Sequence, residues 1–151
     1  MTERIALIAA LALGVCAAAD VDGAADVATD PLACAAFLLN DPVPDDRPVV
    51  VVVTRARLQE IGGPYVGPSV EGARTMGLNI PEDPQVEALF LVTAADEGMI
   101  LISRDTDFAA KVHEYVHWLD WKSGAGFDAV TGEARAYAAE IRADAECRPS
   151  P

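Results

Sequence analysis

The residues with the clearest chemical potential are His113, Glu114 and His117, which form a His-Glu-x-x-His motif containing both histidines of the chain. Side chains four positions apart on a helix lie on one face, one turn above the other, so both imidazoles can point at one spot. Two converging imidazole nitrogens are a common start for a zinc site. Glu114, between them, is placed to hold a water molecule and take its proton. The motif therefore predicts metal-assisted chemistry with Zn2+.

A third metal ligand has to come from elsewhere, because catalytic zinc sites usually use three protein ligands and leave one position for water. With no further histidine in the chain, this ligand has to be a carboxylate or a thiolate. Glu133 and Glu140 are the leading candidates, since seven residues apart they share one helix face. They lie roughly 10 Å apart along the axis, so only one can reach the ion. Asp120, three residues after His117, is placed to orient an imidazole or to compete as a ligand.

Two segments carry a resemblance to a known family: His113-Glu114-x-x-His117 and, after a glycine-containing loop, Glu133-Ala134-Arg135-Ala136-Tyr137. Together they resemble the glutamate-zincin branch of the zincin metallopeptidases, in a small secreted form. In that branch a helix downstream of the histidines supplies a glutamate, often with alanine three residues later. Glu133 with Ala136 matches this pattern, and Glu140 with Ala143 also matches it, so Glu133 is a preference. The resemblance covers about residues 99–140.

The resemblance implies a zinc ion held by His113, His117 and Glu133. It also implies that Glu114 is the general base for a water that attacks a peptide carbonyl, and that it then passes the proton to the leaving amine. A tyrosine or histidine is expected to stabilise the oxyanion. With no third histidine, the candidates are tyrosines: Tyr137 first, then Tyr65 and Tyr115. The implied function is a secreted zinc metallopeptidase acting on peptide or protein substrates.

Two other interpretations stay open. The same residues can form a catalytically inactive zinc site that stabilises a small fold or binds a partner. Glu114 favours catalysis, because a purely structural site needs no carboxylate beside its first histidine. Residues 20–151 are, however, a short chain for a peptidase and leave little surface for substrate pockets. The last interpretation is a metal-free interaction protein, which predicts no zinc at all.

The N-terminal region has the features of a secretory signal peptide. An apolar run over residues 5–15 ends in small residues, and Ala17-x-Ala19 offers a cleavage site after Ala19. The run is shorter than the ~20 residues that a spanning helix needs, so no membrane association is expected in the mature form. Cys16 offers a lipoprotein alternative, which Val15 disfavours because such sites normally have a small residue there. We expect a secreted or periplasmic protein.

Two cysteines, Cys34 and Cys147, remain after this segment. In an oxidising compartment such a pair suggests one disulfide, which would close a long loop and contribute on the order of 4–5 kcal/mol in the chain-entropy model. The alternative is two free, buried thiols. The net charge of −13 argues against nucleic acid and anionic membrane surfaces as partners.

The remaining pattern predicts an α+β fold. In it a small sheet, made of a valine-rich strand and a hairpin, packs on the His-Glu-x-x-His helix and on a C-terminal glutamate helix. We expect a single domain over residues 20–151, preceded by the signal peptide at residues 1–19. Phe108, Val112 and Leu119 recur at helical spacing and are expected in the core, and Trp118 and Trp121 are expected to pack there or at its rim.

The expected secondary-structure elements follow from runs of apolar residues, from helix-capping residues and from glycines and prolines that interrupt regular structure. They are a helix over 31–39 capped by Asp30, a valine strand over 48–54 covered on both faces, a helix over 55–61 stopped by Gly62-Gly63-Pro64, a glycine- and proline-rich loop to Pro84, a hairpin of 86–92 and 98–103, the motif helix from Asp105-Thr106-Asp107 to about 122, and a helix over about 133–146.

Overall fold

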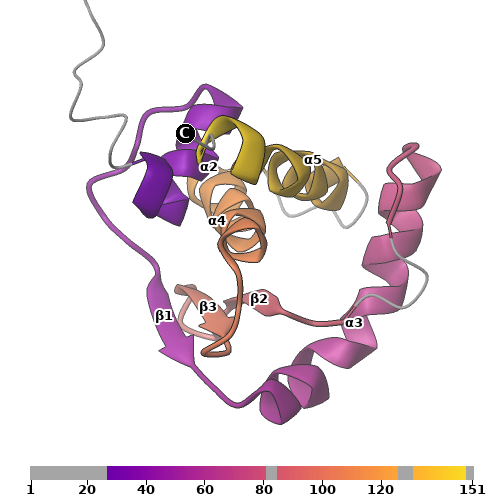
Figure 1. The fold of residues 1–151 in the computed structure, drawn as a ribbon. Coiled ribbons are helices and arrows are strands. Elements are labelled where there is room, and N and C mark those ends of the chain that lie inside the picture. Colours follow the sequence, from indigo (N-terminus) through magenta and orange to yellow (C-terminus); the bar gives the residue numbers. More distant parts are fainter. Residues whose placement is uncertain (1–26, 81–84, 126–130, 149–151) are drawn as a thin grey trace, which may run out of the picture.

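A computed structural model describes residues 27–80, 85–125 and 131–148, without the side chains of residues 65–69. The architecture is α+β, as expected, with a three-stranded mixed sheet and helices around it (Figure 1). Within the described ranges, no helix combines the length and the apolar character needed to cross a membrane. In chain order the elements are α2 (Pro31–Leu39), β1 (Val49–Val52), α3 (Arg55–Thr75), β2 (Ala88–Val92), β3 (Gly98–Ile102), α4 (Phe108–Ser123) and α5 (Thr131–Glu146).

The strand order in the sheet is β1-β3-β2. β2 and β3 form the predicted antiparallel hairpin, with Phe90 opposite Ile100. β1 adds parallel to β3, with Val50 opposite Ile100. Successive strand residues face opposite sides, and Phe90 and Ile100 share their core with α4, whereas Leu101 packs with Leu58 of α3. The sheet is therefore held between α4 and α3.

The valine strand is less covered than its sequence predicts. We expected residues 48–54 to be buried on both faces, but Val49, Val50 and Val52 are 55%, 41% and 56% exposed. α3 and α4 both contact β2 and β3, whereas β3 is the one described element in contact with β1. The apolar run correctly predicts a strand. Its burial depends on where the helices end up, which the run itself does not specify.

The prediction that Gly62-Gly63-Pro64 stops the second helix is wrong, and so is the loop expected after it. α3 continues through all three residues to Thr75. Its first turn is capped by Thr54, whose hydroxyl oxygen accepts a hydrogen bond from the Arg57 N–H at 3.2 Å. The segment expected to be loop is therefore mostly a helix that reaches from the sheet to α5.

α3 contains two interior prolines, Pro64 and Pro68, each of which costs about 3 kcal/mol, and buried contacts near both ends of the helix offset this cost. Leu58 is fully buried beside the sheet, and Val70 and Ala73 are buried in a second cluster near the C-terminal end of the helix. At Gly62 the helix backbone packs closely against the side chain of Val86. A Cβ at this position would lie 2.6 Å from Cγ1 of Val86. A glycine that looks like a helix stop therefore allows the helix to approach its neighbour.

The two helices that carry the chemical residues agree closely with their predictions. Asp107 is the N-cap of α4, and its carboxylate accepts a hydrogen bond from the Ala110 N–H at 2.7 Å. Gly124 ends this helix in the left-handed conformation, with φ of 70°. α5 begins two residues before the expected start and ends at the expected Glu146. Figure 1 shows α4 and α5 next to each other, and they are in contact.

α2 is the predicted short helix, and it is covalently tied to the end of α5. Asp30 caps it by accepting a hydrogen bond from the Leu32 N–H at 3.0 Å. Cys34 on this helix forms the predicted disulfide with Cys147, 113 positions later. A disulfide is typical of an oxidising compartment. Residues 1–19, expected to be the signal peptide, lie outside the described residues.

The disulfide gives a direct prediction for the purified protein. Titration of the denatured, unreduced protein is expected to find no reactive thiol at Cys34 or Cys147, because both sulfur atoms are in the bridge. After reduction both should react. If both thiols titrate before reduction, the bridge is absent in solution. Because Cys16 would add a thiol if residues 1–19 are retained, the titration should be combined with mass determination.

Both tryptophans of α4 pack against the sheet, as expected. Trp118 is 2% exposed, and the ring of Trp121 lies 6.2 Å from that of Phe90 between centroids. Gly98 at the start of β3 makes this contact possible. A Cβ there would lie 2.7 Å from Cδ1 of Trp118 and 2.9 Å from Cζ3 of Trp121.

Gly98→Ala is therefore expected to lower the free energy of unfolding by about 1–3 kcal/mol, because the added methyl overpacks the contact between α4 and β3. Urea unfolding in the presence of a chelator measures this. The matched control is Gly132→Ala, whose new methyl would meet no atom of the described residues within 4 Å. Its change should stay within about 1 kcal/mol. Equal losses in both variants would contradict the packing argument.

Candidate metal centre

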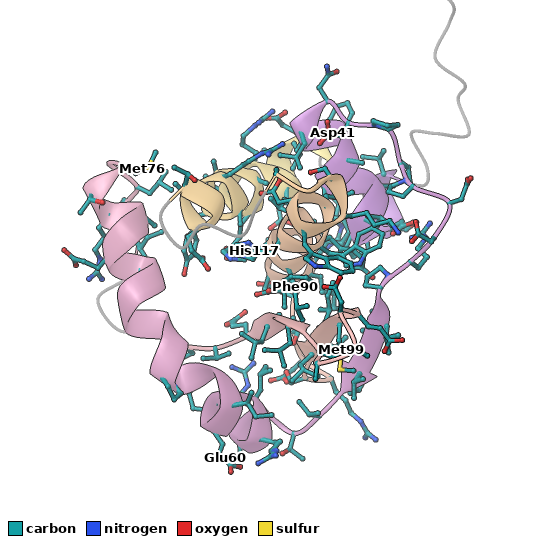
Figure 2. All side chains as sticks on the ribbon, turned by 180° about the vertical axis from the view of Figure 1, so that it is seen from behind. Asp41, Glu60, Met76, Phe90, Met99 and His117 are labelled. Atoms are coloured by element: carbon teal, nitrogen blue, oxygen red, sulfur yellow. A yellow bond between two sulfur atoms is a disulfide. The ribbon has the colours of Figure 1, made fainter. Side chains whose placement is uncertain are left out.

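Three buried side chains from two helices converge on one point. His113 and His117 lie on consecutive turns of α4, and Glu133 lies in the first turn of α5. Their residues are 7%, 3% and 7% exposed. One ligand atom from each lies within 4.8 Å of the other two. Figure 2 shows His117 pointing from α4 toward the side on which α3 lies.

The separations between the donor atoms are short enough for one metal ion to contact all three side chains. His113 Nε2 lies 3.2 Å from His117 Nε2 and 3.4 Å from Glu133 Oε2, and His117 Nε2 lies 3.3 Å from Glu133 Oε1. Zinc–ligand bonds of about 2.0–2.1 Å at tetrahedral angles place donor atoms roughly 3.3 Å apart. Two imidazoles and one carboxylate also match the donor set of catalytic zinc sites that keep a fourth position open. The group could therefore hold a metal ion.

Glu140 contacts the opposite ring nitrogen of His113. Its Oε2 lies 2.8 Å from His113 Nδ1. When Nδ1 carries the proton and donates it to this carboxylate, Nε2 keeps its lone pair for a metal. Glu133 and Glu140 thus lie on one helix face, as expected, but at different nitrogens of the same imidazole. Glu140 is placed to orient a ligand instead of being one.

The surrounding carboxylates stabilise positive charge at the imidazole of His113. Burial lowers the pKa of His113, but hydrogen bonds with Glu133 and Glu140 outweigh this effect and raise the pKa to about 10. Burial by itself raises the pKa of Glu133, but its contacts with His113 and His117 hold that pKa well below the usual range. The metal-free site therefore attracts a proton, and a divalent cation would supply the same compensating charge.

Asp120 does not join the three metal-facing donors. Its carboxylate accepts a hydrogen bond from the guanidinium of Arg135 at 2.7 Å, which makes an ion pair between α4 and α5. Burial raises the pKa of Asp120, while the charges of Arg135 and His117 act in the opposite direction. Arg135 also approaches Asp41, at 3.6 Å. Glu140, and not Asp120, is therefore the carboxylate placed to orient a ligand imidazole. Asp120 helps hold α4 and α5 together.

Glu114 is buried beside the two imidazoles, with 8% exposure. Burial raises its pKa, and the nearby His113 and His117 lower it in part. The backbone of Phe90 in β2 also supplies a hydrogen bond that favours the carboxylate. The net direction is upward, which makes this carboxylate a better proton acceptor near neutral pH than an exposed one.

Of the three predicted tyrosines, the structure brings Tyr137 to the site. Its ring lies 4.5 Å from that of His113 between centroids, nearly edge-on at 77°. Burial, followed by the neighbouring carboxylates, raises the pKa of Tyr137, so the phenol stays protonated and can donate a hydrogen bond. Burial, followed by the charge of Asp30 at the start of α2, raises the pKa of Tyr115. None of the residues that shift it belongs to the metal centre. The side chain of Tyr65 lies outside the described residues.

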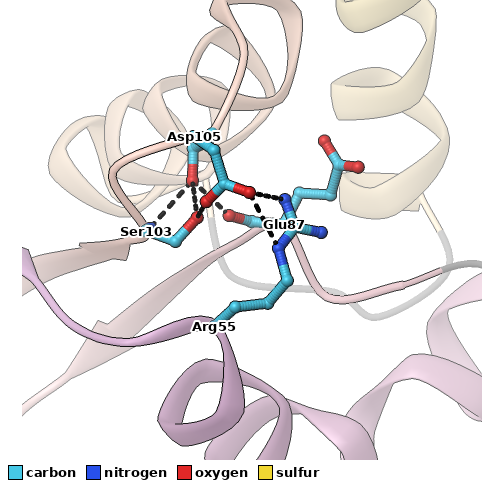
Figure 3. A network of polar contacts seen from close by, with 5 residues as sticks. Arg55, Glu87, Ser103 and Asp105 are labelled. Atoms are coloured by element: carbon cyan, nitrogen blue, oxygen red, sulfur yellow. Dashed lines mark hydrogen bonds and ion pairs between the residues drawn. The ribbon is translucent and has the colours of Figure 1, made fainter.

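A separate polar network fixes the start of α4 relative to the sheet (Figure 3). Arg55 donates two hydrogen bonds to one oxygen of Asp105, at 3.1 and 2.8 Å, and the Ser103 hydroxyl donates to the other oxygen at 2.5 Å. Thr106 donates its hydroxyl proton to the carbonyl of Glu87 at 2.6 Å and accepts from the Ser103 N–H at 2.8 Å. The loop between β3 and α4 is thereby tied to both α3 and β2.

Two contacts of the centre were not foreseen from the sequence. The contact of Glu140 with Nδ1 of His113 has a usable signal, because the seven-residue spacing puts Glu140 on the same face as Glu133. The backbone hydrogen bond from Phe90 to Glu114 has no local signal, because it arises only when β2 lies against α4.

No protein-family model, curated protein or solved structure matches this chain.

Proposed function

We propose that this protein is a secreted or periplasmic zinc-dependent metallopeptidase. The observation that carries the proposal is the buried group of His113, His117 and Glu133, in which one donor atom from each side chain lies within 4.8 Å of the other two. Glu114 beside them is a carboxylate that a purely structural metal site does not require. The disulfide supports an oxidising location.

In this proposal His113, His117 and Glu133 hold the zinc ion, and Glu140 fixes the orientation of the His113 ring. When bound, zinc supplies a Lewis acid that polarises a carbonyl group and lowers the pKa of water toward about 7. With three protein donors, a bound ion would keep one coordination position for water or substrate. With its Nδ1 proton donated to Glu140, His113 would offer the lone pair of Nε2 to a metal that displaces the second ring proton.

Glu114 and Tyr137 carry the proton and charge steps. Glu114 accepts a proton from the attacking water, and its raised pKa suits this task near neutral pH. It then returns the proton to the leaving amine. Tyr137, kept neutral by its surroundings, donates a hydrogen bond to the oxyanion that forms on the attacked carbonyl.

The second candidate function is a catalytically inactive zinc-binding domain. It is favoured by the depth of the site, because all three donors and Glu114 are less than a tenth exposed. A buried metal can stabilise a small fold without taking part in a reaction. The two functions differ in whether a peptide is hydrolysed when zinc is present.

Removal of the metal separates these functions. Metal analysis of the purified protein is expected to find about one zinc per chain. Cleavage of a library of fluorescence-quenched peptides should stop on incubation with a chelator and return when zinc is added back. Zinc at full occupancy with no cleavage of any library member would favour the structural role. A protein that takes up no zinc would contradict both functions.

A further inference from the structure

The outer edge of β1 is apolar, and no element of the described ranges pairs with it. The Val53 N–H donates to the Ile102 carbonyl of β3 at 2.8 Å, so the backbone groups of Val51 and Val53 face the sheet. Since successive strand residues alternate in direction, the backbone N–H and C=O groups of Val50 and Val52 face outward. The side chains of Val50 and Val52 are 41% and 56% exposed.

Such an edge is a template for pairing with another strand. Natural proteins usually protect sheet edges with lysine, a bulge or a covering element. β1 consists of four valines, and among the described elements only β3 contacts it. Pro48 before the strand and the helix cap Thr54 after it limit the open edge to the valines.

The charges on the two sides of β1 are opposite. Asp45 and Asp46 precede the strand, and Arg55 and Arg57 follow it, all of them exposed. Asp45 takes part in no ion pair within the described ranges, and Asp46 pairs with Lys122. In the same stretch Arg47 is already neutralised by Asp30, at 2.6 Å. After these pairs, Asp45 is the acidic side chain near the start of the strand that has no ion-pair partner among the described residues.

An open hollow of about 850 Å³ lies at the basic end and is lined by Val52 of β1 together with Arg55, Arg57, Arg104 and Asp105. Asp105 neutralises Arg55, and Arg57 pairs with Glu60 at 2.7 Å. Arg104 is exposed and forms no ion pair within the part of the chain that the structure describes. In a protein with a net charge of −13, this hollow is a local site for negative charge.

We propose that β1 pairs antiparallel with β1 of a second copy of this chain, which makes a symmetric dimer with one continuous sheet. The outward backbone groups allow a register in which Val50 faces Val52 of the second copy and the reverse, with Val51 at the two-fold axis. Both strands use the same groups, as a two-fold interface requires. The exposed valines of the two copies cover each other.

The charge pattern selects the antiparallel arrangement. It brings Asp45 and Asp46 of each copy to the arginine-lined hollow of the other, and it does so at both ends of the strand pair. A parallel arrangement would place the acidic ends together and the basic ends together. The two local attractions act against the repulsion between two acidic chains.

The first test is the molar mass of the purified protein over a range of concentrations, by sedimentation equilibrium or light scattering. We expect reversible association to a mass of two copies. Val50→Lys, which places charges on the open edge, should raise the dissociation constant roughly tenfold or more. Val92→Lys is the matched control, because Val92 is 45% exposed on the strand at the opposite side of the sheet. It should leave the dimer unchanged.

A charge exchange tests the same interface without altering the strand. Asp45→Arg and Arg104→Asp should each weaken association, because each sets like charges against each other across the dimer. The double variant should restore it. A monomer at every concentration, or a dimer that Val50→Lys leaves intact, would overturn the proposal. So would a dimer weakened equally by Val92→Lys, or two single charge variants that the double variant does not rescue.

Discussion

Glu133→Ala is expected to abolish stoichiometric zinc binding, because among the described residues Glu133 is the one carboxylate that faces Nε2 of both His113 and His117. Two imidazoles alone would leave the ion with two protein ligands, fewer than zinc sites use. Glu133→Gln is the companion variant, since it keeps the side-chain volume while removing the charge. Circular dichroism and thermal unfolding would establish that both variants remain folded.

Glu140→Ala is the informative comparison for this prediction. Glu140 contacts the outer nitrogen of His113, and loss of such an orienting partner typically lowers metal affinity by about 10–100-fold without removing the site. Glu146→Ala serves as a neutral control, because Glu146 is exposed and pairs with Arg142 at the far end of α5. Affinity is measured by competition with a chromophoric chelator. A larger loss for Glu140→Ala than for Glu133→Ala would overturn the assignment of the third ligand.

Glu114→Gln is expected to lower kcat for peptide hydrolysis by about 10²–10⁴-fold while zinc stays bound. The amide has nearly the same shape as the carboxylate but cannot accept the proton of the attacking water. Glu114 is not one of the three donors, so metal content should match that of the wild type. Steady-state kinetics with the best peptide of the library, together with metal analysis of the same sample, measure both quantities.

Glu97→Gln is the matched control for that experiment, since it makes the same chemical change at an exposed glutamate in the turn between β2 and β3. Its kcat should equal that of the wild type. If Glu114→Gln retains full activity at full zinc occupancy, Glu114 is not the general base. If it loses zinc as well as activity, Glu114 contributes to holding the metal.

Local signals in the sequence predicted the elements that carry the site. Asp30, Asp107 and Gly124 are short-range caps, and they start or end α2 and α4 where the sequence indicates. The spacing of His113 and His117 brings their nitrogens together for the same reason, because it depends only on helical geometry. Contacts that need two elements to meet are less visible in the sequence.

The errors all concern tertiary packing. The valines of β1 look fully buried as a run, yet α3 and α4 cover the other two strands. Gly62 and Pro64 look like a helix stop, yet α3 continues because its two ends are buried. From the sequence, Asp120 is placed to orient a histidine, yet its carboxylate forms an ion pair with Arg135 of α5. In each case the deciding neighbour lies far away in the sequence.

The sequence separation of the two disulfide cysteines also sets a minimum time before the bridge can form during biosynthesis. At roughly 5–20 residues per second, a ribosome makes Cys147 about 6–23 s after Cys34, because 113 positions separate them. Glu133 and Glu140 emerge in the same late interval, on the helix that leads directly into Cys147. A nascent chain therefore carries the imidazoles of His113 and His117 before it contains Glu133, Glu140 or Cys147. The cross-link can form only after Cys147 has been made, and the cation-binding group only after Glu133.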